Sequence, residues 1–359
     1  MKIAVLGSGN GGCAVAFECA KADHEVSMFD FQNFPDNINA IRESGGIYSE
    51  GQMQGFQEIL YAGFDIEKAL KDAQLIFVVG PAYSTKPFAE VCKPYLKKGQ
   101  IVLVCPGSCA GSIVFKNALG KAAMDEEYII GETSTLPYAV RLTGPGKIHV
   151  FLKLKAGVLI SALPSKYTDQ VKASVASIYP YMVPAKNVLQ TSLQNANPII
   201  HPVIALLNTA LIERTKGDFC FYEDGVTESV GKLIEALDKE RIAIGRALGF
   251  EIIPDPELGM LQGYMQEPTY GRGYSGANGF KGIKAPASLD YRYINEDVGY
   301  GLVFMAELGK QLEVPTPVAD SMITIASTVM MRDYRKEKAR TLESLGLGSC
   351  SLNELRENL

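Results

Sequence analysis

A glycine-rich loop near the amino terminus is the feature that most constrains how this chain can fold. The loop Gly7-Ser8-Gly9-Asn10-Gly11-Gly12 has the pattern G-x-G-x-x-G. It follows the short apolar run KIAVLG (2–7) and precedes a helix-like stretch at about 11–22. A strand, this loop and a helix in that order predict a Rossmann-type unit that binds a dinucleotide. The alternative interpretation is an ordinary turn between a strand and a helix.

Each glycine of the loop has its own physical purpose. Gly7 permits the tight turn, Gly9 lets the backbone approach the pyrophosphate, and Gly12 lets the helix pack closely on the sheet. The helix that follows presents unpaired N–H groups and the positive end of its dipole to the phosphates. We therefore expect Gly7, Gly9, Asn10, Gly11 and Gly12 to bind the cofactor.

An acidic residue stands at the end of the second predicted strand, EVSMFD (25–30). A carboxylate at the position of Asp30 hydrogen-bonds the ribose hydroxyls and repels a 2′-phosphate. No Arg or Lys follows Asp30 before Arg42. NAD(H) is thus favoured over NADP(H), and FAD is a lesser alternative because no second flavin-contact motif follows. Asp30 could also simply terminate its strand.

The first half of the chain alternates strand-like and helix-like segments. Continuous apolar runs at 75–80, 101–107 and 128–134 suit buried parallel strands, and helical patterns lie at 65–73, 112–123 and 165–178. Three β-like pieces between 136 and 163 predict an antiparallel extension of the sheet. We expect a doubly wound, mostly parallel α/β domain. Ligands bind beyond the carboxyl ends of such strands, so Pro81, the loop at 106–108 and Thr133-Ser134 should surround the nicotinamide.

The second half has mainly helical patterns, at 196–213, 226–248, 298–312 and 317–331. Between 263 and 290 lies a Gly- and Tyr-rich stretch without helical period, and long loops of this kind are often functional. We expect two domains: 1–183, which binds the dinucleotide, and 184–359, which is all-α and binds the substrate.

Composition excludes several classes of protein. A net charge of −5 disfavours nucleic acid as a partner. The seven cysteines are odd in number and form no C-x-x-C pair, which favours free buried thiols over disulfides or a metal site. The amino-terminal apolar run is too short for a signal peptide or a membrane span. We expect a cytoplasmic protein without metal or membrane partner.

Only three histidines are present. His24 is expected at the surface and His149 in a structural position. His201 lies in the apolar segment SLQNANPIIHP, between two prolines, with Asn197 four residues earlier on the same helix face. It could be an ordinary core histidine, or it could belong to a site.

A charged cluster, DYRYINEDV (290–298), precedes an apolar helix. Asp297 could merely cap that helix, and Arg292 could be a surface cation. A dehydrogenase for carboxylated substrates needs an imidazole to move a proton, a carboxylate to stabilise the imidazolium, and an arginine for the substrate carboxylate. His201, Asp297 and Arg292 supply that set.

Several of these segments together resemble a known family. The marks are VLGSGNGGCA near the start, PGSCAG (106–111), GETSTLPY (131–138), TSLQNANPIIHP (191–202), YRYINEDVGYGLV (291–303) and VPTP (314–317). Over nearly its whole length the chain resembles the NAD-dependent opine dehydrogenases, which include octopine, nopaline and carboxyethyl-norvaline dehydrogenases. The Asn-x-x-x-His-Pro segment with Arg-x-x-x-Glu-Asp-Val is the most specific mark.

The resemblance implies a helical domain of the 6-phosphogluconate-dehydrogenase type and a reaction. A 2-oxo acid condenses with the amino group of an amino acid, and NADH reduces the imine. His201 would be the general acid and base with Asp297, and Arg292 would bind a carboxylate. The remaining implied substrate contacts are Asn197, Ser108 and Thr133, with Glu132 towards the amino substrate. A homodimer is possible, and the stretch 263–283 matches no family motif.

Two other functions remain open. One is a simple 2-oxo acid reductase of the ketopantoate or glycerol-phosphate type, which relies on a catalytic lysine. No lysine stands beside Asn197, although Lys153 or Lys155 could serve. The other is a protein that senses NAD(H) without turnover. The sequence does not identify the amino acid or the oxo acid.

Overall fold

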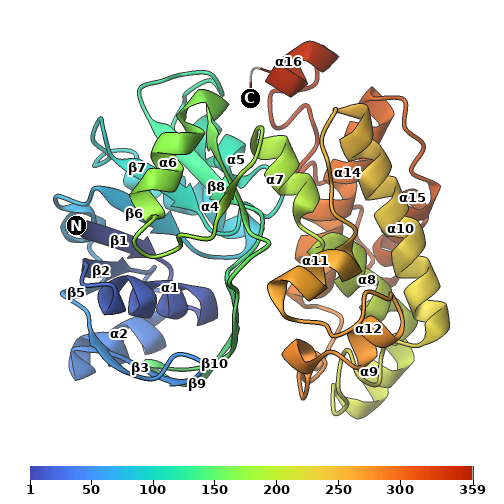
Figure 1. Ribbon diagram of the computed structural model, residues 1–359, viewed down its shortest axis with the longest axis horizontal. Helices are drawn as coiled ribbons and strands as arrows, with labels where there is room; N and C mark the ends of the chain where they lie inside the picture. The colour runs from blue at the N-terminus through green and yellow to red at the C-terminus, as the bar shows by residue number, and fades with distance from the viewer. Residues whose placement is uncertain (358) are drawn as a thin grey trace. The chain divides into compact units, whose positions relative to one another are not determined.

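The computed structural model describes residues 1–357 and 359. Contacts within the chain divide it into two compact units (Figure 1). The first contains Met1–Gly107, Gly111–Thr191 and Leu359, and the second contains Ser108–Ala110 and the described residues from Ser192 to 357. Helix α7 (Val188–Gln194) spans the division.

The main sheet of the first unit has the strand order β12-β11-β8-β7-β6-β1-β2-β5. Its strands are β1 (Lys2–Leu6), β2 (Glu25–Phe29), β5 (Tyr61–Gly63), β6 (Leu75–Val78), β7 (Ile101–Val104), β8 (Ile129–Thr133), β11 (Leu159–Leu163) and β12 (Val183–Pro184). Every neighbouring pair is parallel except β8 with β11. The predicted doubly wound, mostly parallel sheet is confirmed.

Helices pack on this sheet because its strands are apolar on both faces and must be shielded from water. All residues of β6 and β7 are buried, as expected for strands packed on both faces. Ile66, Phe88 and Phe115 belong to one core cluster with these strands. They come from α3 (Ile66–Leu70), α4 (Thr85–Cys92) and α5 (Gly111–Ala118). The other helices of the unit are α1 (Asn10–Lys21), α2 (Pro35–Ser44) and α6 (Thr168–Val175), with short 3₁₀ turns η1 (Ala82–Ser84) and η2 (Ser165–Tyr167).

A second sheet corrects one prediction. It has the order β4-β3-β10-β9, formed by β3 (Gly46–Gly51), β4 (Gly55–Glu58), β9 (Tyr138–Gly144) and β10 (Lys147–Lys153). Of the three β-like pieces expected to extend the main sheet, only β11 does so. The other two form a hairpin whose strand β10 pairs in parallel with β3. Strands β3 and β4 escaped prediction because they are polar and Gly-rich rather than continuous apolar runs.

The second unit is helical. It contains α8 (Asn197–Leu207), α9 (Thr209–Thr215), α10 (Glu228–Ala247), α11 (Asp255–Gln262), α12 (Arg272–Ser275), η3 (Asn278–Phe280), α13 (Arg292–Glu296), the π-helical turn η4 (Asp297–Leu302), α14 (Val303–Gln311), α15 (Pro317–Val329) and α16 (Leu352–Glu357). The single helix predicted at 196–213 is two helices that meet at Asn208. The helix predicted from 298 begins six residues earlier, at Arg292.

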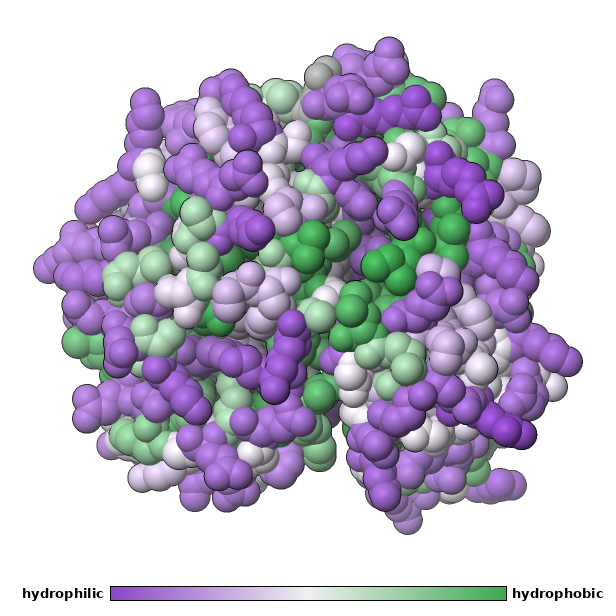
Figure 2. Space-filling view, in the orientation of Figure 1, coloured by the Kyte–Doolittle hydropathy of each residue, from purple (hydrophilic) through white to green (hydrophobic). Residues whose placement is uncertain are grey.

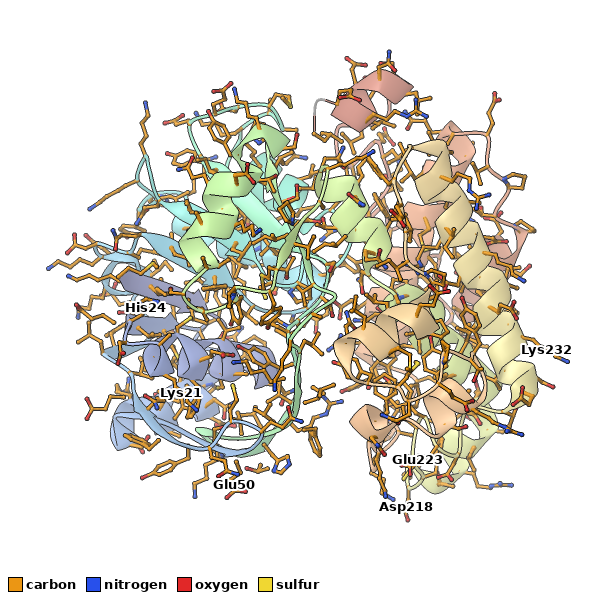
Figure 3. The ribbon with its side chains drawn as sticks, in the orientation of Figure 1. Lys21, His24, Glu50, Asp218, Glu223 and Lys232 are labelled. Carbon is orange, nitrogen blue, oxygen red and sulfur yellow. The ribbon has the colours of Figure 1, made fainter. Side chains whose placement is uncertain are left out.

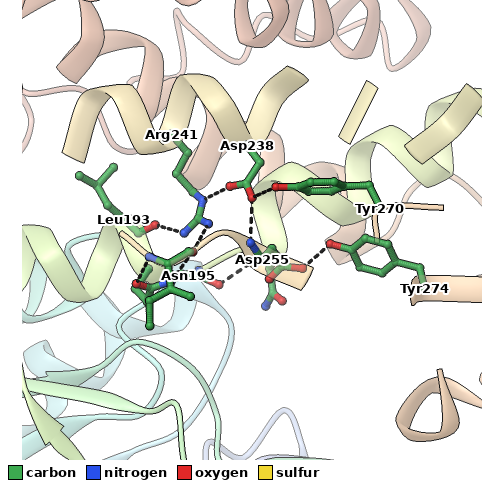
Figure 4. Close-up of polar contacts among 10 residues, drawn as sticks. Leu193, Asn195, Asp238, Arg241, Asp255, Tyr270 and Tyr274 are labelled. Atoms are coloured by element: carbon green, nitrogen blue, oxygen red, sulfur yellow. Dashed lines mark hydrogen bonds and ion pairs between the residues drawn. The ribbon is translucent and has the colours of Figure 1, made fainter. Parts of the chain in front are cut away.

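A buried polar network ties the Gly- and Tyr-rich stretch to α10 (Figure 4). Arg241 is 0% exposed, and its guanidinium donates to Asp238 Oδ1 at 2.6 Å and to two backbone carbonyls. Asp238 Oδ2 accepts from the Tyr270 hydroxyl at 2.6 Å and from the Asp255 N–H at 2.8 Å. The Tyr274 hydroxyl donates to Asp255. Two tyrosines of an otherwise irregular segment are thus fixed by buried carboxylates.

Hydrophilic residues make up most of the face shown in Figure 2, and hydrophobic residues lie among them. Figure 3 shows Lys232 pointing outward from α10 and Glu50 at the margin of the first unit. All seven cysteines are free thiols, and five of them are buried. Within residues 1–357 and 359, no helix is both long and apolar enough to cross a bilayer.

Candidate active site

The glycine loop has the geometry that its pattern predicts. Gly7 has φ +107°, and a Cβ there would lie 2.1 Å from the carbonyl oxygen of Val79. A Cβ on Gly12 would lie 1.9 Å from the carbonyl oxygen of Gly7. A Cβ on Gly9, in contrast, would meet none of the described residues within 4 Å apart from its chain neighbours. Gly7 and Gly12 therefore have no room for a side chain, and Gly9 leaves open space at the amino end of α1, the end of a helix that favours anions.

Asp30 is built into this loop and is more than a strand terminator. The carboxylate is 7% exposed, and its Oδ2 accepts from the Ser8 N–H at 2.7 Å and from the Ser8 hydroxyl at 2.6 Å. Its Oδ1 accepts from the Phe31 N–H at 2.8 Å. Because a carboxylate oxygen can accept two hydrogen bonds, Oδ1 retains capacity for a ribose hydroxyl.

The other expected cofactor residues line the same region of the first unit. Asn10 Oδ1 accepts from the Leu142 N–H at 2.7 Å and so ties the start of α1 to β9. A Cβ on Gly11 would lie 3.0 Å from the side chain of Leu136, which leaves that helix face tightly covered. Pro81 immediately precedes η1, and its carbonyl accepts from the Ser84 hydroxyl at 2.7 Å.

Glu132, expected towards the amino substrate, is engaged within the first unit. Its side chain is 0% exposed. Oε2 accepts from the Ser112 N–H at 2.9 Å and from the Ser112 hydroxyl at 2.6 Å, and Oε1 accepts from the Thr191 hydroxyl at 2.6 Å. This carboxylate therefore holds the first turn of α5 in place. Neighbouring Thr133 is 1% exposed, and its hydroxyl donates to the carbonyl of Thr135 at 3.0 Å.

Ser108 lies in a strained turn. Ser108, Cys109 and Ala110 have φ angles of +44°, +63° and +61°, a left-handed conformation that costs energy at each non-glycine residue. The turn is held by hydrogen bonds within the second unit. The Ala110 N–H donates to the Ser192 hydroxyl at 2.8 Å, and Arg340 Nε donates to the Cys109 carbonyl at 2.9 Å. Strain maintained in this way is common at ligand-binding turns.

His201 and Asp297 meet, although 96 residues separate them. His201 is 6% exposed and Asp297 is 3% exposed, and Nδ1 lies 2.8 Å from Asp297 Oδ2. Nε2 lies 3.0 Å from the hydroxyl of Tyr222. Since an ionised carboxylate can only accept, Nδ1 carries a proton, and in the neutral ring Nε2 accepts the tyrosine hydroxyl. A buried histidine with this carboxylate partner is equipped for acid–base chemistry.

The backbone explains how the two side chains reach each other. The alternative that Asp297 caps a helix is wrong, because α13, η4 and α14 form one continuous helical segment from 292 to 311. Asp297 opens the π-helical turn, a distortion frequent at functional sites. A Cβ on Gly301 in the same turn would lie 2.3 Å from Cγ of Pro198 in α8. The absent side chain therefore lets the turn approach the helix that carries His201.

Arg292 begins α13, in the helical segment that carries Asp297, and Asn197 begins α8, which carries His201. Arg292 Nε is 3.2 Å from Glu296 Oε2; the arginine side chain is 41% exposed and that of Glu296 is 5% exposed. A guanidinium has five N–H groups, so this pairing leaves a partly exposed fork for a carboxylate ligand. Asn197 is half-buried at the start of α8, where its N–H donates to Asn195 Oδ1 at 3.2 Å.

Aromatic rings that the sequence did not single out surround His201. Tyr293 stacks on the imidazole with ring centres 4.1 Å apart, and Phe221 packs on Tyr293 at 4.7 Å. Tyr222 stacks in turn on Phe280 at 4.1 Å. The sequence signal for this cluster was the density of aromatic residues at 219–222, 263–283 and 291–293, which has no fixed spacing.

One of the two lysines that the simple-reductase alternative could use, Lys153, is engaged elsewhere. Lys153 forms an ion pair with Glu18, which is 6% exposed in α1 and also accepts from Tyr138. The ammonium group therefore neutralises a buried carboxylate of the first unit, which argues against its use as a catalytic acid.

Family models match both halves of the chain. The family model for the NAD-dependent glycerol-3-phosphate dehydrogenase N-terminus matches residues 2–113, and that for the α-helical domain of NAD/NADP octopine/nopaline dehydrogenase matches residues 184–330. The chain is 35% identical to an opine dehydrogenase of Arthrobacter sp. (strain 1C), over 98% of this chain and 97% of the relative. This chain belongs to the opine dehydrogenase family.

Solved structures show the same fold. An octopine dehydrogenase described with NADH and L-arginine has a TM-score of 0.80 at 17% identity, covering 100% of this chain and 98% of that one. A yersinopine dehydrogenase described with NADP⁺ has a TM-score of 0.71 at 16% identity, covering 99% and 97%. As an opine dehydrogenase, this protein is an NAD(H)-dependent oxidoreductase that acts on CH–NH groups, and the predicted family, fold and cofactor are confirmed.

Proposed function

We propose that this opine dehydrogenase joins a 2-oxo acid of the pyruvate type to the amino group of an amino acid, and that it catalyses the reverse oxidation. The observation that carries the proposal is the buried 2.8 Å contact between His201 and Asp297. Reductive condensation needs a group that first donates and later accepts protons, and an imidazole oriented by a carboxylate does both near neutral pH.

The chemistry assigns a task to each residue. The amine attacks the oxo carbon, and the protonated form of His201 supplies the proton with which the carbinolamine oxygen leaves as water. The glycine loop and Asp30 would hold NADH, which would supply the hydride that reduces the imine carbon. Oxo acid, amino acid, NADH and one proton thus become opine, NAD⁺ and water. Asp297 stabilises the imidazolium, and Arg292 binds a substrate carboxylate. Asn197, Ser108 and Thr133 are proposed as neighbouring substrate contacts, and Glu132 is not.

A substrate panel tests this proposal against the alternatives. NADH oxidation is measured with pyruvate alone and with pyruvate plus each of a set of amino acids. We expect oxidation only when an amine is present, and the mass of the product should equal that of the reduced condensate. Oxidation with pyruvate alone would support a simple reductase. NADH binding without any turnover would support a sensing protein.

A histidine variant tests the assignment of the acid. His201→Asn should bind NADH normally and lose at least about 100-fold in kcat, the usual contribution of a general acid. His24→Asn is the matched control, since the His24 ring nitrogens lie within hydrogen-bond distance of the amino-terminal amine and of the Ser177 hydroxyl, both in the first unit. Turnover of His201→Asn within a few-fold of the unmodified enzyme would show that His201 is structural.

A further inference from the structure

The Tyr222 hydroxyl contacts Nε2 of His201, the ring nitrogen that is not bonded to Asp297. The tyrosine side chain is 5% exposed, and its hydroxyl lies 3.0 Å from His201 Nε2. The other ring nitrogen, Nδ1, is bonded to Asp297 at 2.8 Å. A proton that left through Nδ1 would pass to a carboxylate whose purpose is to remain ionised. In this arrangement the proton path from His201 therefore runs through the phenol oxygen.

The hydroxyl suits both protonation states of the ring. When the imidazole is neutral, Tyr222 donates to Nε2. When the imidazole is protonated, Nε2–H donates to the tyrosine oxygen, which frees the hydroxyl proton to point at another acceptor. Both states keep one hydrogen bond between the same two atoms, so no side chain has to move between them.

We propose that Tyr222 relays the proton between His201 and the substrate. The proposal rests on the reductive condensation described above. In the forward direction the proton on Nε2 passes to the tyrosine oxygen while the hydroxyl proton of Tyr222 passes to the departing carbinolamine oxygen. One O–H bond of the tyrosine breaks as another forms, so Tyr222 ends unchanged. A concerted transfer is required because a free tyrosinate, whose parent phenol has a pKa of about 10, is costly near neutral pH.

Stacked aromatic rings fix Tyr222 for this task. The centre of its ring lies 4.1 Å from that of Phe280 with planes 14° apart, and the ring centre of Tyr264 lies 4.8 Å from that of Phe280. Phe221 meets Tyr222 edge-on at 5.1 Å and 88°. Phe280 and Tyr264 belong to the Gly- and Tyr-rich stretch 263–283, so the relay gives that segment a role: it orients the phenol towards His201.

The test is Tyr222→Phe, which removes only the hydroxyl and keeps the stacked ring. We expect kcat to fall about 10- to 100-fold, within the range of a general acid–base contribution, while the Kd for NADH stays within two-fold. The rate in mixtures of H₂O and D₂O provides the specific readout. A relay moves two protons, so the solvent isotope effect should depend on the D₂O fraction along a curve. That dependence should become linear, or the effect should vanish, in Tyr222→Phe.

Tyr181→Phe is the matched control, because the Tyr181 hydroxyl has no hydrogen-bond partner among the described residues and lies in the first unit. It should leave kcat and the isotope effect unchanged. The proposal is overturned if Tyr222→Phe keeps kcat within three-fold, or keeps the curved dependence. Should Tyr222→Phe fail to fold, Phe280→Leu keeps the hydroxyl but removes its support, and full activity in that variant would overturn the positioning argument. Failure of the reductive condensation itself would differ, since the unmodified enzyme would then show no amine-dependent turnover.

Discussion

At the scale of single residues, the charge on Asp297 should matter more than its shape. An amide in its place can still accept from Nδ1, but it cannot stabilise an imidazolium, and it can rotate to donate and so select the wrong tautomer. We predict that Asp297→Asn lowers kcat by about 10² to 10⁴-fold while NADH affinity is unchanged. Steady-state kinetics and NADH fluorescence titration measure the two effects.

The control for this variant is Asp320→Asn on α15, where the aspartate side chain is 52% exposed and pairs with Arg335. It carries the same chemical change in the same unit and should retain full kcat. If Asp297→Asn also turned over within three-fold of the unmodified enzyme, the pair would be a structural contact rather than an acid–base device.

Asp30 should decide the choice between the two nicotinamide cofactors. Its charge repels a 2′-phosphate, whereas its hydrogen bonds to Ser8 shape the loop. Asp30→Asn removes the charge and keeps an acceptor for Ser8. We predict that the ratio of kcat/KM for NADH to that for NADPH falls at least about 10-fold, equivalent to about 1.4 kcal/mol.

Asp72→Asn is the comparison, because Asp72 is 55% exposed beside Lys2, before the start of β6 and so at the amino edge of the sheet. It should leave the cofactor ratio unchanged. An unaltered ratio in Asp30→Asn would mean that the preference for NADH is set elsewhere in the first unit.

These residues also show what a sequence can reveal. The glycine loop and Asp30 were predictable because their roles depend on local backbone geometry and a short, fixed separation. His201 and Asp297 were predicted as partners only from the chemistry that a dehydrogenase needs and from the family resemblance. Tyr222 was missed because its contact with His201 depends on how α8 packs against the aromatic cluster, and no spacing rule describes such a cluster.

At the scale of elements, the packing of the π-helical turn η4 against α8 brings Asp297 within hydrogen-bond distance of His201. The two segments approach each other closely at Gly301, where an added Cβ would lie 2.3 Å from Pro198 Cγ. We predict that Gly301→Ala forces the two segments apart, lowers the free energy of unfolding by about 1–3 kcal/mol as overpacking does, and reduces kcat because the distance between His201 and Asp297 increases. Denaturant midpoints and steady-state kinetics measure both.

Gly144→Ala in β9 is the matched control, since a Cβ there would meet none of the described residues within 4 Å beyond its chain neighbours. It should change stability by less than about 0.5 kcal/mol. Unchanged stability and activity in Gly301→Ala would indicate that η4 can shift without disturbing the pair.

The same scale explains where prediction of the fold stopped. Apolar runs buried on both faces identified β1, β6, β7 and β8, because such runs are typical of parallel strands covered by helices. Strands β3 and β4 carry no such run and are stabilised by pairing with β10 and with each other. The π-helical turn was likewise invisible, since its apolar residues fit an ordinary helix equally well.

At the scale of the whole molecule, one buried carboxylate should make stability depend on pH. Burial, and then the negative charge of Asp238, raise the pKa of Asp255 from 3.8 to about 6, against the lowering effects of Tyr274 and Arg241. In the unfolded chain the pKa returns to an ordinary value near 4. Between these two pH values the folded state binds more protons than the unfolded state, so stability decreases as pH rises. Above about pH 6 the full cost, about 3 kcal/mol for about two pKa units, is present.

Asp255→Asn removes this dependence, because the amide stays neutral while its oxygen still accepts the Tyr274 hydroxyl. We predict that the unfolding free energy of the variant minus that of the unmodified enzyme increases by up to about 3 kcal/mol between pH 4 and pH 7 and then stays constant. Asp333→Asn is the comparison: Lys336 lowers the pKa of this exposed aspartate, so any change should be small and opposite in sign. A difference for Asp255→Asn that stays flat from pH 4 to pH 7 would mean that Asp255 ionises equally easily in both states, and that Arg241 compensates fully for its burial.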